Sequence, residues 1–337
     1  MKKIKIDYLA QPTIGLNQSG MKTQIDTLFE YFKNTDKIEV DKYNIWKSNK
    51  PDIIHYFGMG EGMLTLLQKL KENGCKIICS PNHWPIKSSF DKILMSINIK
   101  NVIYSNRVTK KYLLENADLF IVNSEAEKIK FIETYRVSSD RIKVIHNSYG
   151  SEPYLINKCL FREKYNILKP YALMAGQIGS VRKNQLPVLQ CWKESYPDLY
   201  LLGGYDKTPY GKKCFKFIED KNNIHYLGFE SEYEILESAY QQCELFISPG
   251  LIETPSLSAF RALINGAKVC STNFGGAPNE YFSDNVRYFD PYNKNEIAST
   301  IDASLKSEKW MIDFEGLKKF SNYSINQEYK KIYLNLF

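Results

Sequence analysis

The sequence predicts an α/β protein built from two doubly wound domains, and three observations support this prediction. Ten short apolar runs bounded by turn residues alternate with helical stretches along the 337 residues, which is typical of parallel sheets wound by helical crossovers. Ten strands are too many for one small sheet, and the length fits about two domains. The runs are interrupted once, by a polar segment at residues 147–169 that is followed by Pro170.

The first expected unit is a strand, a loop and a helix. Residues 3–10 alternate as a strand does, and residues 11–20 carry the turn formers Pro12 and Gly15. From Met21 to Phe32 the apolar residues fall on one face of a helix. Further strands are expected at residues 52–57, 76–80, 119–123, 142–146, 171–175, 199–202, 224–227, 245–248 and 268–271.

The polar segment sets the expected domain boundary. We expect residues 1–155 to form the first domain and residues 165–321 the second. A final helix is expected at residues 324–336, and chain order alone would pack it on the second domain. The mean hydropathy of −0.39 argues against a membrane-spanning helix. Because the first residues show no apolar signal segment, the expected location is the cytoplasm.

Charge and cysteine content argue against two further classes. The net charge of +7 lies entirely in residues 1–115, which hold 18 Lys/Arg and 11 Asp/Glu, and this excess does not by itself indicate nucleic-acid binding. The seven cysteines are irregularly spaced without Cys-x-x-Cys, and the four histidines lack zinc-finger spacing. We therefore expect reduced, mostly buried thiols and no metal site.

Ligands of open α/β sheets bind outside the carboxyl ends of the strands, and the loop after residues 245–248 is the first candidate there. Thr254 is expected as the N-cap and Pro255 as the first residue of a helix that continues over residues 256–265. The free amides of a helix start suit a phosphate, while the Glu253 carboxylate can accept hydrogen bonds from sugar hydroxyls. The same pattern also fits a capped helix with an ordinary acid at its start.

The loop after residues 171–175 is the second candidate. Gly176 and Gly179 are followed by the adjacent cations Arg182 and Lys183, which indicates a diphosphate clamp. It is neither a Walker loop nor a Gly-x-Gly-x-x-Gly motif. The alternative is a solvated turn.

Two further strand ends carry candidate residues. Gly275 and Gly276 would let the backbone approach a ligand closely, or they form a plain tight turn. His83, on the loop after residues 76–80, is a candidate sugar-binding or acid–base residue, unless it bonds nearby backbone. His55 lies inside an apolar run and is expected in the core or on a cleft wall.

In this order the segments resemble the retaining glycosyltransferases of family 4, which have the GT-B fold of two Rossmann-like doubly wound domains facing across a cleft. The resemblance is strongest over residues 170–290. Its motifs are the glycine loop and lysine at 171–184, the strand ending in Leu-Gly-Phe at 224–229, the donor motif beginning at Glu253, and a Gly-Gly-x-Pro-Glu-like loop at 275–280 with Asn279 inserted before the acid.

The resemblance implies a hexosyltransferase that uses a UDP- or GDP-linked sugar and needs no metal or other cofactor. The donor would bind the second domain, and the first would bind a glycan or lipid-linked acceptor of polysaccharide or lipopolysaccharide synthesis. The tail at 322–337 would pack back on the first domain. The implied catalytic residues are Glu253 and His83. The implied donor-binding residues are Gly176, Gln177, Arg182, Lys183, Phe229, Thr254, Pro255, Ser256, Leu257, Arg261, Gly275 and Gly276, and the implied acceptor or phosphate loop contains Gly15, Asn17 and Gly20.

Two positions depart from the family pattern. Gln177 stands where the family usually has arginine, and Arg182 is the candidate that would replace its charge. Arg261 stands where the family has the glutamate that accepts from the ribose, and arginine cannot accept a hydrogen bond. Either ribose recognition has changed, or Arg261 binds a phosphate, or the donor site has decayed.

These departures keep two other functions open. A non-catalytic GT-B subunit would bind acceptor or a partner protein without turning over a donor. A nucleotide-sugar epimerase would need a cluster of acidic and histidine side chains, of which only His83 and Glu253 are evident.

The resemblance also places the basic excess in the acceptor-binding domain. Cations interleaved with apolar residues suit an anionic membrane surface on the cytoplasmic side, or they form a solvated basic face. The candidate residues are Lys87, Lys92, Lys100, Arg107, Lys110 and Lys111.

Overall fold

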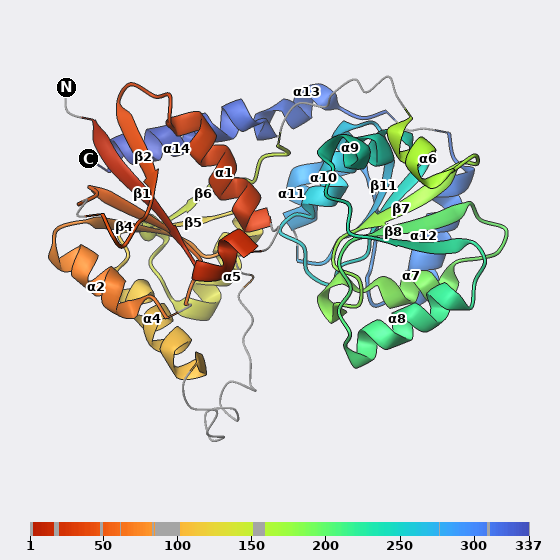
Figure 1. The fold of residues 1–337 in the computed structure, drawn as a ribbon, viewed down its shortest axis with the longest axis horizontal. Coiled ribbons are helices and arrows are strands. Elements are labelled where there is room, and N and C mark those ends of the chain that lie inside the picture. Colours follow the sequence, from red (N-terminus) through yellow and green to blue (C-terminus); the bar gives the residue numbers. More distant parts are fainter. Residues whose placement is uncertain are drawn as a thin grey trace. The chain divides into compact units, whose positions relative to one another are not determined.

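The computed structural model describes residues 3–16, 20–47, 50–60, 62–82, 84, 102–150, 159–275, 277–308 and 311–336. These residues form two six-stranded parallel sheets covered by helices, which is the predicted α/β class (Figure 1). The chain divides into two compact units. Unit 1 comprises Met1–Ser148 and Asn322–Phe337, and unit 2 comprises Tyr149–Ser321.

The sheet of unit 1 has the strand order β2-β1-β3-β4-β5-β6. Its strands are β1 (Ile4–Ala10), β2 (Ile38–Lys42), β3 (Ile53–Phe57), β4 (Lys76–Ser80), β5 (Leu119–Val122) and β6 (Ile142–Val144). The sequence predicts all of them except β2. Because β2 is an edge strand that carries Glu39 and Asp41, it lacks the apolar run by which the other strands are found.

Helices cover both faces of this sheet (Figure 1). One face packs against α1 (Gly20–Phe32) and α14 (Asn322–Asn335), and the other against α2 (Leu64–Glu72), α4 (Val102–Asn116) and α5 (Glu125–Tyr135). The 3-10 turns η1 (Pro12–Leu16) and η2 (Ser139–Arg141) lie in the connections.

A buried histidine joins α14 to the sheet of unit 1. His55 on β3 lies 2.7 Å through Nδ1 from the Tyr333 hydroxyl of α14, and 2.8 Å through Nε2 from the Ser80 hydroxyl at the end of β4. Burial lowers the pKa of His55 to about 3, so the ring is neutral at physiological pH. His55 is therefore a core histidine, and the last helix packs on unit 1 rather than on the unit that precedes it in the chain.

The sheet of unit 2 has the strand order β12-β11-β10-β7-β8-β9. Its strands are β7 (Tyr171–Ala175), β8 (Asp198–Leu202), β9 (Ile224–Gly228), β10 (Leu245–Ser248), β11 (Lys268–Thr272) and β12 (Arg287–Phe289). Only β12 was not predicted from the sequence, because a three-residue edge strand gives no periodic signal.

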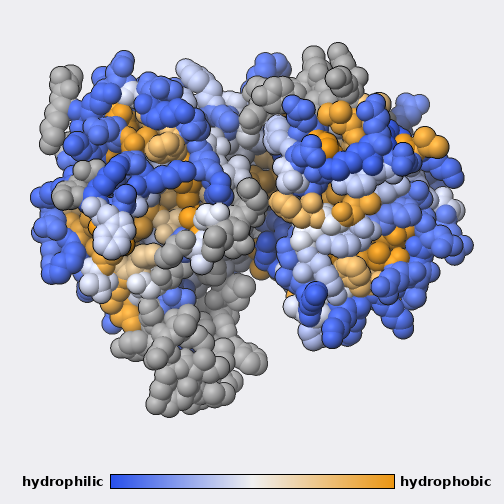
Figure 2. Space-filling view, viewed as in Figure 1, coloured by the Kyte–Doolittle hydropathy of each residue, from blue (hydrophilic) through white to orange (hydrophobic). Residues whose placement is uncertain are grey.

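Two apolar clusters hold the helices of unit 2 on its sheet. One face carries α6 (Leu160–Tyr165), α9 (Tyr233–Gln242), α10 (Leu257–Ile264) and α11 (Ala277–Phe282), and the other carries α7 (Gln185–Cys191), α8 (Pro209–Glu219) and α12 (Lys294–Lys306). The remaining turns are η3 (Val181–Lys183), η4 (Ser283–Asn285), α13 (Phe314–Leu317) and η5 (Lys318–Phe320). Hydrophilic residues cover most of the outer surface visible in Figure 2.

All seven cysteines are unpaired thiols. Five are buried, Cys191 is half-buried and Cys159 is exposed. The expectation of mostly buried cysteines is therefore confirmed.

Asp7 is a buried carboxyl group in the middle of β1. Its strand neighbours on the same face include Glu39 and Asp41 of β2, while Lys5 and Lys47 partly offset their charge. Burial first, and then Asp41, raise the pKa of Asp7 to about 6. Ionised Asp7 therefore destabilises unit 1 at neutral pH.

We expect Asp7→Asn to stabilise the protein above pH 7 and to have little effect below pH 4. The native pKa lies above the unfolded one, so the wild type loses stability as pH rises through about 6, and the variant does not. A difference of two pKa units corresponds to at most about 3 kcal/mol. Urea unfolding at pH 4, 6 and 8 measures this, with the exposed Asp36→Asn as control. A pH-independent difference would contradict the assignment.

Candidate functional site

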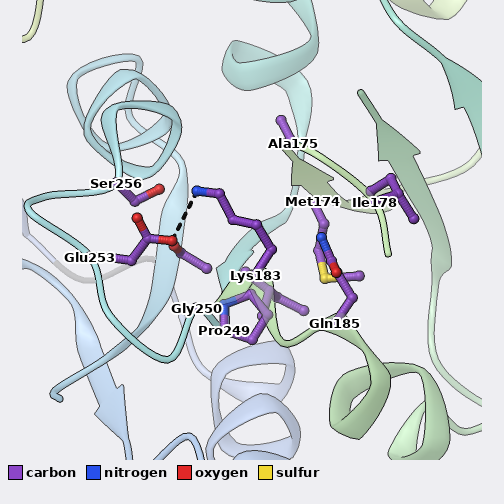
Figure 3. A pocket seen from close by; sticks show the side chains of 11 residues that line it. Met174, Ala175, Ile178, Lys183, Gln185, Pro249, Gly250, Glu253 and Ser256 are labelled. Carbon is purple, nitrogen blue, oxygen red and sulfur yellow. Dashed lines mark hydrogen bonds and ion pairs between the residues drawn. The ribbon is translucent and has the colours of Figure 1, made fainter. Parts of the chain in front are cut away.

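The candidate site lies in unit 2, at the carboxyl ends of β7 and β10. These two strands are neighbours in the sheet, but β7 continues to β8 on one side while β10 continues to β11 on the other. Such a topological switch point is where open α/β sheets bind their ligands. A pocket at this point is lined by residues of both strands and the loops that follow them: Met174, Ala175, Ile178, Lys183, Gln185, Ile247, Ser248, Pro249, Gly250, Glu253 and Ser256 (Figure 3).

An ion pair between the two loops forms the centre of the pocket. The Lys183 ammonium lies 2.9 Å from Glu253 Oε1, and Figure 3 shows its side chain extended toward that carboxylate. Arg182 Nη1 lies 3.7 Å from the other carboxylate oxygen. Glu253 is 4% exposed, so its charge requires these partners. The structure thus brings together Lys183 and Glu253, which are 70 positions apart in the sequence.

Hydrogen bonds to backbone carbonyls hold the two loops and the η3 turn in place. The amide of Leu251 donates to the Arg182 carbonyl at 2.8 Å, and Arg182 Nη1 donates to the Ile252 carbonyl at 3.3 Å. Asn184, directly after η3, donates through its side chain to the Pro291 carbonyl at 2.9 Å. These bonds fix the η3 turn that presents both cations.

Two glycines lie beside the ion pair, and each is needed for a different reason. A Cβ on Gly250 would overlap the Glu253 carboxylate, so only glycine allows the observed position of that side chain. Gly176 has a φ of +146° and a Cβ there would lie 3.6 Å from Lys183 Cε. Gly176 is therefore required for its backbone conformation. Gly250 is required for space, and no sequence motif singled it out.

Gln177 lies in the loop after β7, and Gln185, the first residue of α7, lines the pocket. Gln177 donates through its side chain to Asp206 at 2.8 Å, and its carbonyl accepts from the Gln185 side chain at 2.8 Å. The side-chain oxygen of Gln185 is buried in the pocket wall and has no hydrogen-bond partner among the described residues. A buried acceptor without a partner is costly, and a hydrogen-bond donor on a ligand would satisfy it.

The donor-motif helix begins two residues later than the sequence predicts. The N-cap of α10 is Ser256, whose hydroxyl accepts from the Ala259 amide at 3.3 Å. The predicted N-cap Thr254 and first helical residue Pro255 are therefore wrong, and both lie in the loop. Ser256 is the N-cap because its side chain reaches the free amide three residues later, as an N-cap must. Leu257 becomes the first helical residue.

Arg261 points into the interior of unit 2. Its guanidinium forms a bidentate pair with Glu237 of α9, through Nε at 2.8 Å and through Nη2. It also donates to the Tyr149 carbonyl at 3.0 Å and to the Tyr233 hydroxyl at 2.8 Å. Its side chain and that of Glu237 are 12% and 1% exposed. Arg261 is not among the pocket-lining residues, and Glu237 neutralises its charge.

The remaining predicted donor residues are not among those that line the pocket, or they lie outside the described residues. Phe229 follows β9 and is largely exposed. Gly275 has a φ of +91° in the turn after β11. Gly276, His83 and Asn17 lie outside the described residues, so their roles stay predictions.

In unit 1, Gly15 lies in η1 and Gly20 begins α1. Of the predicted basic patch, Lys87, Lys92 and Lys100 lie outside the described residues. Lys110 donates to the Tyr135 hydroxyl at 2.7 Å. Exposed Lys111 lies 3.9 Å from Glu115 one turn away, and Arg107 is half-buried on the same helix. The described part of the patch thus presents one exposed ammonium beside a carboxylate.

Within the described ranges, no group of three His, Cys, Asp or Glu side chains is arranged to hold a metal ion. The pocket offers the Lys183 ammonium, a buried carboxylate and the start of an eight-residue helix, and the Arg182 guanidinium lies beside the carboxylate. Such a set can bind a phosphate group through its cations and amides and hydroxyl groups through its carboxylate.

Comparison with known proteins agrees with this arrangement. Residues 41–149 match the family described as Glycosyltransferase Family 4, and residues 160–327 match the family described as Glycosyl transferases group 1. No curated protein matches the sequence.

Solved structures share the fold along nearly the whole chain. HepE from Anabaena, determined with UDP and glucose, is 16% identical with a TM-score of 0.72 over 99% of this chain and 100% of that chain. A glycosyltransferase from Rickettsia africae is 17% identical with a TM-score of 0.69, over 99% and 98%. The lipopolysaccharide outer core galactosyltransferase WaaB is 14% identical with a TM-score of 0.67, over 99% and 100%.

We expect Glu237→Gln to lower the free energy of unfolding by about 3 kcal/mol, because it leaves the buried Arg261 without a countercharge. Urea unfolding measures this change. Glu232→Gln is the control, since Glu232 forms an exposed pair with Lys164, and its stability should equal that of the wild type. Equal stability of both variants would show that the Arg261 pair is not structural.

Proposed function

Because the chain belongs to the family 4, group 1 glycosyltransferases with the GT-B fold, we propose that it transfers a hexosyl group from a nucleotide-diphospho-sugar to a glycan or lipid-linked acceptor with retention of configuration. The observation that carries this proposal is the Lys183–Glu253 pair at the β7/β10 switch point of unit 2. It combines a cation for a diphosphate with a buried carboxylate for a sugar.

The donor diphosphate would bind on the cation side of the pocket. Lys183 and Arg182 would contact its oxygens, and the amides at the start of α10 would add neutral donors. Glu253 would accept hydrogen bonds from the hexose hydroxyls once Lys183 turns to the phosphate. The Gln185 side-chain oxygen, without a partner among the described residues, would accept one hydrogen bond from the donor.

In the transfer step, the leaving diphosphate of the donor takes the bonding electron pair and also accepts the proton of the acceptor hydroxyl. The bond between the sugar anomeric carbon and the diphosphate oxygen breaks, and the diphosphate leaves with the bonding electron pair. The acceptor hydroxyl attacks from the face that the diphosphate leaves, and its proton passes to the leaving phosphate oxygen. Positive charge from Lys183, Arg182 and the α10 amides stabilises the developing charge, so we propose that the reaction proceeds without a metal and that EDTA leaves the rate unchanged. His83 is proposed to approach the donor sugar.

Two of the structural neighbours bear on the choice of substrate. HepE was determined with UDP-glucose, and WaaB acts as a galactosyltransferase on the lipopolysaccharide outer core. On this basis a UDP-hexose is the first donor to test, with GDP-linked sugars next, and a lipid-linked or polysaccharide acceptor is the first acceptor.

A non-catalytic subunit is the second candidate function. It is favoured by Gln177, which is neutral where a cation would bind the donor phosphates. It is also favoured by Arg261, whose guanidinium is paired with Glu237. Calorimetry with UDP and GDP separates the two functions, because a subunit that has lost its donor site would bind neither nucleotide.

We expect Glu253→Ala to lower kcat by at least about a hundredfold, because the carboxylate contacts the reacting sugar. Nucleotide release from a panel of UDP- and GDP-sugars measures the rate, and NMR of the product establishes the anomeric configuration. Glu219→Ala, an exposed carboxylate on α8, should retain the wild-type rate. Undiminished turnover by folded Glu253→Ala would remove Glu253 from the reaction.

We expect Lys183→Met to weaken donor binding about tenfold to a hundredfold, the loss of one charge-assisted hydrogen bond. Calorimetry measures the Kd of the nucleotide diphosphate, and circular dichroism checks the fold. Unchanged affinity would refute the assignment of Lys183 to the diphosphate.

A further inference from the structure

The turn after β2 carries two adjacent large apolar side chains that are exposed to solvent. Ile45 is 67% exposed and Trp46 is 89% exposed. Trp46 is the most exposed aromatic side chain among the described residues. Ile45 and Trp46 are adjacent, so their exposed apolar surfaces are contiguous, and contiguous apolar surface is a candidate for an interaction site.

The turn is built to present this pair outward. The Asn44 side-chain oxygen accepts from the Trp46 amide at 2.9 Å, and the Asn44 carbonyl accepts from the Lys47 amide at 3.0 Å. The Tyr43 amide donates to the Tyr8 carbonyl at 2.9 Å, which ties the turn to β1. On the other side Lys47 pairs with Asp41 at 2.6 Å. Trp46 is therefore exposed by an ordered Asx turn, whose backbone bonds keep it from folding back to the core.

Lysines flank the apolar tip. Lys42 and Lys47 lie on its two sides, and Lys50 follows in the chain. No acidic residue occurs between Lys42 and Asp52 in the sequence. The first two lysines pair with Asp26 of α1 and Asp41 of β2, and both lysine side chains remain more than half exposed.

This combination fits a lipid surface better than a protein. Two apolar side chains are far less than the area of about 800 Å² that each partner of a stable protein complex buries. A bilayer interface requires no shape complementarity, and tryptophan concentrates there because its ring is apolar while its N–H is polar. Nearby lysines add attraction to anionic headgroups. No helix among the described residues is long and apolar enough to cross a bilayer.

We propose that the turn of residues 43–47 is an interfacial anchor, in which Trp46 and Ile45 insert between anionic lipid headgroups while Lys42, Lys47 and Lys50 contact the phosphates. This surface is distinct from residues 87–111, and it stands on exposure and turn geometry rather than on the donor site. An enzyme that extends a lipid-linked acceptor would be held by it at the membrane.

Co-sedimentation of the full chain with vesicles of phosphatidylglycerol and phosphatidylcholine tests the anchor. We expect the wild type to bind, Trp46→Ser to reduce the partition coefficient about tenfold, and Trp46→Phe to restore part of it. Leu168→Ser is the matched control, because Leu168 is a 94% exposed apolar residue of unit 2. It should bind as the wild type does.

Fluorescence adds a readout that does not depend on overall affinity. Bromine-labelled lipids should quench wild-type emission, and the quenching should be lost in Trp46→Ser even at lipid concentrations where it binds. Glu253→Ala should still bind vesicles, which separates this proposal from that of the donor site. Absence of wild-type binding, or equal binding and quenching for Trp46→Ser, would overturn the anchor. In the latter case loss of binding in Lys110→Glu/Lys111→Glu would assign the contact to α4.

Discussion

The buried carboxylate of Glu253 is the group on which the arrangement of unit 2 depends. A charge that is 4% exposed requires a countercharge, and Lys183 supplies it from the loop of another strand. The pair therefore fixes two loops at once. It also accounts for Gly250, because a side chain there would displace the carboxylate.

A second buried ion pair lies on the donor-motif helix α10. At the position where the family has a glutamate, Arg261 binds Glu237 of α9 and the Tyr149 carbonyl. Tyr149 is the first residue of unit 2, and its amide donates to the Phe320 carbonyl near the end of that unit. The arginine thus connects the donor-motif helix to the place where the chain enters and leaves unit 2.

The sequence predicts correctly those features that depend on a local residue pattern. It does not predict those that depend on contacts between residues far apart in the chain. Ten strands follow from their apolar runs, whereas β2 and β12 are missed because edge strands are short or charged. Lys183 and Glu253 were identified separately, and their meeting follows from parallel strands that end at one edge. The N-cap was misplaced because Thr254 is a good cap by type and is followed by Pro255, which suits the first helical position. Nothing in the sequence marks Glu237 as the partner of Arg261, since helical spacing relates only residues of the same helix.

The charge of the pocket follows from these two pairs. Gln177 is neutral and Arg261 is neutralised by Glu237, so Arg182, Lys183 and Glu253 leave the described pocket with one net positive charge. A nucleotide diphosphate carries more negative charge than that. Its binding would therefore depend on neutral donors, namely the backbone amides at the start of α10, more than in relatives with an arginine after the glycine. Because fixed amide dipoles are less sensitive to salt than exposed ion pairs, donor affinity in this chain should vary little with ionic strength, and calorimetry between low and high salt would distinguish amides from side-chain cations as the main phosphate ligands.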